Sequence, residues 1–181
     1  MNKFCARADN APREFTQHAR NPARSVRIGG ANTVFVPAYG CPFVHDIDRG
    51  RRVWKTALPN GVFSTPSIAR DGTVYVGCLD GKLYALNPLT GSIQWTFDAD
   101  GMMIMGSAGI DGNGIVYVGD TNGILYAISP NGEEIWRFAA NSNIRSAPVI
   151  TSDGTLYLTS FDSTLYAISQ PTAVRDWLLF H

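Results

Sequence analysis

The chain has 181 residues, 45% of them apolar, and 15 lysines and arginines balance 15 aspartates and glutamates. A net charge of zero gives no electrostatic reason to expect nucleic acid or an anionic membrane as a partner. No apolar run approaches a membrane span, and the residues after Met1 lack the apolar core of a signal peptide. The sequence as written therefore predicts a soluble, cytoplasmic protein.

The first region, residues 1–52, shows no internal period and is rich in arginine. Residues 1–24 are expected to be loosely ordered or weakly helical. Two short apolar runs, Thr33–Val36 and Phe43–Val44, predict a β-hairpin. We expect a separate, loosely structured N-terminal segment with little core of its own.

From residue 53 onward two strand-like segments recur three times, each alternating large and small side chains with the period of a half-buried strand. The first segment occurs at Thr73–Gly77, Ile115–Gly119 and Thr155–Thr159, and the second at Leu83–Leu86, Leu125–Ile128 and Leu165–Ile168. The residue pairs between them favour tight two-residue hairpins because they tolerate positive φ. These pairs are Asp80-Gly81, Asn122-Gly123 and Asp162-Ser163.

Each repeat gains two further strands. Short apolar segments precede the pair at Pro66–Ile68, Ala108–Ile110 and Pro148–Ile150, and the last strand carries a tryptophan. The tryptophans lie 41 residues apart, at Trp54, Trp95, Trp136 and Trp177. A four-stranded antiparallel unit repeated at this interval is typical of a β-propeller blade, in which a large indole can pack between neighbouring sheets.

The number of blades is too small for a closed ring. One isolated tryptophan strand, Val53–Leu58, and three repeats make about three blades, whereas closed propellers use about four to eight. The fold class is therefore all-β, a partial propeller with exposed terminal faces. We expect self-association that completes the ring, a protein partner, or a longer parent protein.

The run from Ala85 to Trp95, Ala-Leu-Asn-Pro-Leu-Thr-Gly-Ser-Ile-Gln-Trp, resembles the tryptophan-docking repeat of propellers of the pyrroloquinoline-quinone (PQQ)-like superfamily. That superfamily includes quinoprotein alcohol dehydrogenases and the propeller lipoprotein of the outer-membrane assembly machinery, and its members are often periplasmic or extracellular. The resemblance covers residues 53–181 and implies the fold, with the four tryptophans as blade-docking residues.

The arginine-rich region has a different resemblance. The run Phe15–Gly30, continuing through Val36–Asp46 to Arg52, is similar to the N-terminal segment of the trimethylamine methyltransferase family. Those enzymes are corrinoid-dependent and built on a TIM barrel, but the resemblance covers only residues 13–52. No barrel follows, so it implies no methyltransferase activity. The junction Arg52–Val53 lacks a Gly/Ser/Pro linker, which is more typical of a truncated or chimaeric reading frame than of an evolved two-domain protein.

Residue types that carry chemistry do not cluster in the sequence. Cys5, Cys41 and Cys78 are an odd number at unrelated spacings, which argues against a disulfide framework or a zinc site. Quinoproteins combine a vicinal disulfide, a calcium site and a catalytic Asp, and no adjacent cysteines occur here. The segments Asp98–Gly101 and Asp111–Gly114 resemble calcium loops without the closing Glu, so turn chemistry explains them.

We therefore predict no catalytic, cofactor-binding or metal-binding residues, and a scaffold or protein-interaction module. The non-repeating methionines Met102, Met103 and Met105, with Arg145 at an equivalent loop, form a candidate interaction loop. Two alternatives remain. The chain could be part of a quinoprotein dehydrogenase that binds PQQ and calcium, or a remnant of a corrinoid-dependent methyltransferase.

Overall fold

The computed structural model describes residues 27–29, 33–36, 43–46 and 51–169, and their side chains from Arg52 onward. Every regular element in this part of the chain is a β-strand, so it contains no helix that could span a membrane. The strands form four antiparallel sheets, each built from consecutive strands. The predicted all-β class is confirmed.

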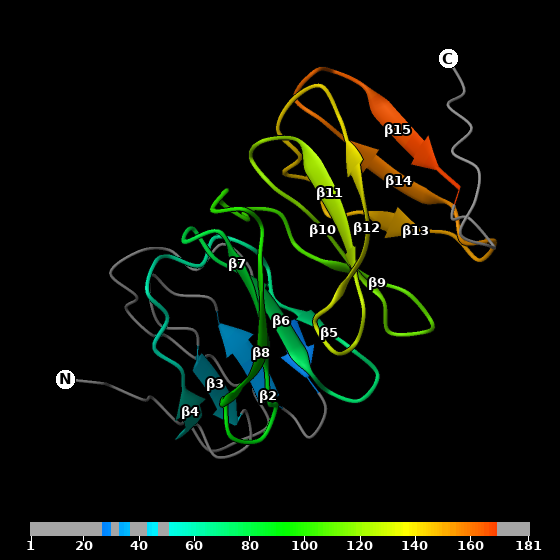
Figure 1. Ribbon diagram of the computed structural model, residues 1–181. Coiled ribbons are helices and arrows are strands. Elements are labelled where there is room, and N and C mark those ends of the chain that lie inside the picture. Colours follow the sequence, from blue (N-terminus) through cyan, green and yellow to red (C-terminus); the bar gives the residue numbers. More distant parts are fainter. Residues whose placement is uncertain (1–26, 30–32, 37–42, 47–50, 170–181) are drawn as a thin grey trace, which may run out of the picture.

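The sheets follow one another in chain order (Figure 1). The first sheet comprises β1 (Arg27–Gly29), β2 (Thr33–Val36), β3 (Phe43–Asp46) and β4 (Arg51–Lys55). The second comprises β5 (Ser67–Ile68), β6 (Val74–Gly77), β7 (Lys82–Leu86) and β8 (Ile93–Asp98). The third comprises β9 (Gly109–Ile110), β10 (Val116–Gly119), β11 (Ile124–Ile128) and β12 (Glu134–Ala139). The fourth comprises β13 (Val149–Ile150), β14 (Leu156–Thr159) and β15 (Leu165–Ile168).

The partial propeller predicted from the repeats is confirmed in the second, third and fourth sheets. The predicted tryptophan strand of the last repeat, with Trp177, lies outside the described residues. The central hairpins share one register, since Gly77, Gly119 and Thr159 pair with Leu83, Leu125 and Leu165. Their turns have the expected positive φ, at 86° for Gly81, 90° for Gly123 and 67° for Ser163.

The first sheet contains the predicted hairpin, with β2 paired to β3, and adds a strand on each side. Strand β4 runs across the Arg52–Val53 junction and pairs with β3. Thus the residues on both sides of that junction belong to the same strand, and this strand is part of a sheet that precedes the three predicted blades. The division of the chain into two domains at residue 52 stays a prediction.

The hydrophobic core lies between the sheets. We call the face of a sheet that points toward the start of the array its leading face, and the opposite face its trailing face. Between consecutive sheets, the trailing face of one packs against the leading face of the next. In the second sheet the leading face includes Val74 and Val76, which pack with Trp54. Its trailing face includes Tyr75 and Leu83, and packs with residues before and within the third sheet, Ile104, Val116, Val118, Tyr126 and Ile128. Apolar burial of this kind is the main force that holds successive sheets together.

Candidate functional site

Two tryptophans contact the following sheet through the same geometry. The indole N–H of Trp54 donates a hydrogen bond to the Pro88 carbonyl at 2.8 Å, and that of Trp95 donates to the Pro130 carbonyl at 2.9 Å. Each ring lies against a glycine of the same turn: an added Cβ would collide with the Trp54 ring at Gly91 and would come within 2.8 Å of the Trp95 ring at Gly132. The turn glycine therefore leaves the space that the indole fills.

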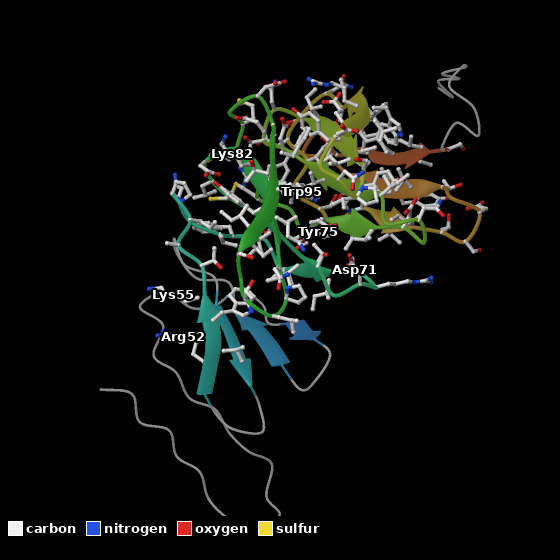
Figure 2. The ribbon with its side chains drawn as sticks, turned by 60° about the horizontal axis from the view of Figure 1, so that its bottom comes forward. Arg52, Lys55, Asp71, Tyr75, Lys82 and Trp95 are labelled. Atoms are coloured by element: carbon white, nitrogen blue, oxygen red, sulfur yellow. The ribbon has the colours of Figure 1, made fainter. Side chains whose placement is uncertain are left out.

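The indoles also pack on their own sheets. Trp95 lies beside Tyr75 with ring centroids 5.4 Å apart (Figure 2), and Trp136 lies 5.8 Å from Tyr117. Thus three of the four predicted docking tryptophans occupy described sheets, and Trp177 lies outside the described residues. The blade-docking role of these tryptophans stays a prediction.

A buried carboxylate in the third sheet was not anticipated from the sequence. Asp120 is fully buried and accepts hydrogen bonds from the backbone N–H groups of Asn122 and Ile124 at 2.9 and 2.8 Å, and from the Tyr126 hydroxyl at 3.1 Å. Burial, followed by the negative charge of Asp120, raises the pKa of Tyr126 above its usual range. These three hydrogen bonds satisfy the buried carboxylate and fix the turn between β10 and β11.

In the second sheet a different residue carries the same role. Asp80, two positions further along the turn, accepts from the Tyr84 hydroxyl at 2.6 Å. Cys78 takes the position of Asp120 and is fully buried, and burial raises the pKa of its thiol to about 11. A thiol held protonated in the core is unreactive.

The predicted interaction loop lies between the second and third sheets. Met103 is 41% exposed, and its carbonyl accepts a hydrogen bond from the Thr121 N–H at 3.1 Å. The neighbouring loop carries Arg145, whose guanidinium lies 4.8 Å from the ring centre of Phe161. The two loops touch, because a Cβ at Gly106 would meet the carbonyls of Arg145 and Ser146 at 3.1 Å. The structure thus brings together the methionine loop and the Arg145 loop.

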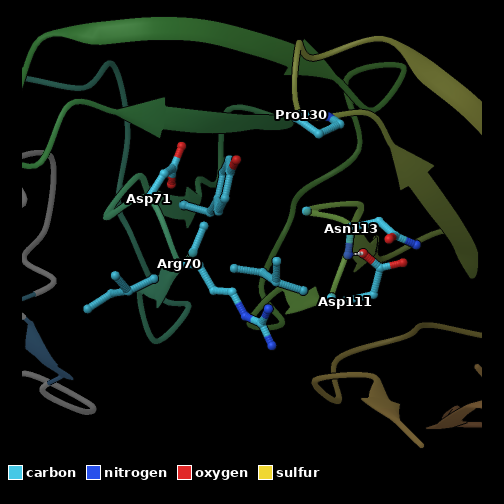
Figure 3. Close-up of a pocket in the computed structure, with 11 residues that line it drawn as sticks. Arg70, Asp71, Asp111, Asn113 and Pro130 are labelled. Atoms are coloured by element: carbon cyan, nitrogen blue, oxygen red, sulfur yellow. Dashed lines mark hydrogen bonds between the residues drawn. The ribbon is translucent and has the colours of Figure 1, made fainter. Parts of the chain in front are cut away.

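A recess of about 400 Å³ opens between the turns that precede β6 and β10 (Figure 3). Its carboxylates already have partners. Asp71 accepts from the backbone N–H and the hydroxyl of Thr73, and Asp111 accepts from the N–H groups of Asn113 and Ile115, all at 2.9 Å. The carboxylates serve the turns, as the sequence predicted for Asp111–Gly114.

The other segment that resembles a calcium loop is engaged in the same way. Asp98 accepts from the Gly101 N–H and pairs with Lys82 at 3.1 Å, and Asp100 pairs with Arg137 at 2.8 Å. The Gly101 N–H, followed by Lys82, lowers the pKa of Asp98. In the described part of the chain, no three His, Cys, Asp or Glu residues gather as metal ligands would.

The most distinctive surface is the trailing face of the fourth sheet, which we name the open face: Val149, Tyr157, Leu165 and Ala167. Tyr157 is 38% exposed, whereas Tyr75 and Tyr117, in the same register, are 3% and 0% exposed. Leu165 is 64% exposed, whereas Leu83 and Leu125 are fully buried. Among the described residues no sheet follows the fourth one. The open face therefore presents to solvent what the other sheets bury.

The repeat pattern gives Tyr75, Tyr117 and Tyr157 equivalent positions, but Tyr157 is exposed where the other two are buried. Sequence equivalence indicates which face of a strand a residue occupies, but it does not say whether another sheet covers that face. The one available signal was that Tyr157 and Leu165 belong to the last described repeat, whose trailing face has no following repeat in the described residues to cover it.

Together these features define a class of protein. Repeated antiparallel sheets that pack face to face, with tryptophans hydrogen-bonded to the next sheet, are the architecture of a β-propeller; among the residues that the structure describes, this one ends at the fourth sheet. Residues 102–180 match the family model described as outer membrane protein assembly factor BamB. Residues 2–58 match the model described as trimethylamine methyltransferase (MTTB). Both resemblances predicted from the sequence are confirmed.

Individual proteins match the same two regions: propeller structures resemble most of the chain, and a methyltransferase matches a short stretch of it. BamB from Moraxella catarrhalis has a TM-score of 0.67 and 20% identity, covering 80% of this chain and 44% of that one. The computationally designed Ika4 protein has a TM-score of 0.69 and 16% identity, covering 86% of this chain and 99% of that one. These likenesses show the fold.

The glycine betaine methyltransferase of Desulfitobacterium hafniense (strain Y51) is 57% identical over 49 residues, which are 27% of this chain and 10% of that protein. The chain thus matches a tenth of this methyltransferase and less than half of the BamB structure. All four strands of the first sheet lie within the methyltransferase match.

Proposed function

We propose that the chain is a non-catalytic β-propeller module that serves as a scaffold or protein-interaction surface within a larger propeller assembly. The observation that carries this proposal is the open face. It exposes apolar side chains at positions where the second and third sheets bury theirs against a neighbour. An exposed apolar face of this kind marks an association surface.

The tryptophan contacts support the scaffold part of the proposal. Trp54 and Trp95 each bridge to the next sheet through a hydrogen bond and a glycine contact. Indoles fixed in this way would hold successive sheets rigidly in line and keep the open face in a defined geometry. We assign them the role of blade-docking residues, with Trp136 and Trp177 at the equivalent sequence positions.

Binding without a cofactor is part of the same proposal. Asp71, Asp98 and Asp111 are satisfied by turn donors or by lysine, which supports a structural role for them. The quinoprotein alternative would require saturable binding of PQQ with calcium. The methyltransferase alternative rests on a match to a tenth of the enzyme. The cytoplasmic compartment stays a prediction.

The test is site-specific photo-cross-linking in cells that make the chain. A benzophenone amino acid replaces Leu165 on the open face and, as the matched control, Leu89, which is 79% exposed in the turn after β7. We expect a discrete protein adduct from position 165 and none from position 89, with the captured protein identified by mass spectrometry. No adduct from either position, or equal adducts from both, would contradict the interaction role.

A further inference from the structure

Two internal contacts show which kind of surface fits the open face. In the second and third sheets, the positions equivalent to Tyr157 and Leu165 are covered by the next sheet. Tyr75 and Leu83 are covered by the leading face of the third sheet and the loop before it. Tyr117 and Leu125 are covered in the same way by Ile144, Leu156 and Leu158. A surface that fits Tyr157 and Leu165 would therefore be the leading face of another sheet of this kind.

The first sheet of the array has the corresponding sequence. Thr33-Val-Phe-Val36 of β2 matches Thr73-Val-Tyr-Val76, and the pairing of Phe35 with Val44 and of Val44 with Trp54 follows that of Tyr75, Ala85 and Trp95. Val34 and Val36 thus occupy the register positions that Val74 and Val76 hold on a leading face. In the described part of the chain no sheet precedes the first one.

In the described part of the chain, the first and fourth sheets lie at opposite ends of the array (Figure 1), and their outer faces do not meet. We propose that two copies of this chain close a ring, in which the open face of each copy packs against the first sheet of the other. This inference rests on the proposed function and names its partner. Two copies of a four-sheet array supply eight sheets, within the range of about four to eight that closed propellers use.

Each of the two junctions is heterologous, and a two-fold rotation closes them into a ring in which both outer faces of the described array are covered. The junction repeats the internal contact between consecutive sheets, and so it needs no new type of surface. It covers Leu165 and Tyr157 in both copies.

The experiment is the solution mass of the purified full chain, measured by size exclusion with light scattering over a range of concentrations. The wild-type chain is expected at twice the mass of one 181-residue chain. Leu165→Lys and, independently, Val149→Lys place an unpaired charge in the junction and are expected to weaken dimerisation at least about tenfold. Because Leu165 and Val149 are 64% and 62% exposed within one chain, either variant should fold, which far-UV circular dichroism verifies.

Leu89→Lys is the matched control, since it also replaces an exposed leucine by lysine, away from the open face. It should dimerise as the wild type does. A monomeric wild-type chain, a trimer or a filament, or open-face variants that behave like Leu89→Lys would each overturn the inference. If the wild type is monomeric while position 165 cross-links to a different protein, the interaction function stands and the two-copy ring fails. If position 165 captures nothing as well, both fail.

Discussion

The third and fourth sheets have closely similar strand sequences and opposite surroundings. Ile115-Val-Tyr-Val-Gly119 corresponds to Thr155-Leu-Tyr-Leu-Thr159, and the central hairpins share one register. Yet Leu125 is fully buried and Leu165 is 64% exposed. Strand formation follows from the local sequence and turn chemistry, whereas burial of the trailing face depends on whether another sheet lies against it. Leucines at the same repeat position are therefore buried in the core of one sheet and exposed on the next.

The largest expected effect is the difference in stability between alanine variants of these two leucines. Leu125→Ala leaves a cavity between the third and fourth sheets and is expected to lower the free energy of unfolding by about 2–5 kcal/mol. Leu165→Ala, at a concentration where the chain is monomeric, is expected to cost less than about 0.5 kcal/mol. Urea unfolding followed by tryptophan fluorescence measures both. Equal losses would mean that the open face is already covered within one chain.

A second comparison uses two turn glycines with nearly equal φ, 89° at Gly132 and 85° at Gly154. Alanine at either position is strained by about 1–2 kcal/mol because positive φ disfavours a Cβ. Only at Gly132 would the Cβ also meet the Trp95 ring, at 2.8 Å, whereas Gly154 has nothing within 4 Å. Gly132→Ala should therefore lose about 1–3 kcal/mol more than Gly154→Ala. If chemical denaturation finds the two variants alike, the docking role of Trp95 is wrong.

The smallest expected effect is the pH dependence of a covered trailing face. Burial, followed by the charge of Asp71, raises the pKa of Tyr75 to about 12. Because this folded-state pKa exceeds the unfolded value of about 10, its contribution is present below pH 10 and lost as pH rises toward 12. Alkaline titration of wild type and Tyr75→Phe should show a smaller loss of stability in the variant, by about 1 kcal/mol per pH unit. Parallel curves would mean that Tyr75 ionises as freely in the folded chain as in the unfolded one.

Much of the fold could be predicted from the sequence because the signals are local. The Asp-Gly and Asn-Gly pairs define the hairpins, and even Ser163 adopts positive φ where the pattern lacks glycine. The interval between tryptophans predicted the repeat, and strands β6, β10 and β14 lie where the apolar runs placed them. The two resemblances located the matched regions.

The arrangement of the candidate surfaces could not be predicted from the sequence, because it depends on contacts between residues that are distant along the chain. The sequence suggested a methionine loop and a separate Arg145, and the approach of Gly106 to Arg145 brings their loops together. The buried Asp120 had no sequence signal of its own, because the same turn in the second sheet places its carboxylate two positions later, at Asp80. A first sheet that spans the predicted junction was likewise hidden, since β1 is recognised only by its pairing and the predicted tryptophan strand, Val53–Leu58, was not assigned to the hairpin before it.

The sequence by itself determined the repeating unit, its turns and the alternation of its strands, because backbone conformation and side-chain direction follow from neighbours within a few residues. Only the tertiary structure decided which of the equivalent faces are covered. Tyr75, Tyr117 and Tyr157 are alike in sequence, but two of them meet a following sheet and the third meets solvent. Burial belongs to a pair of surfaces, and a single strand carries only one of them.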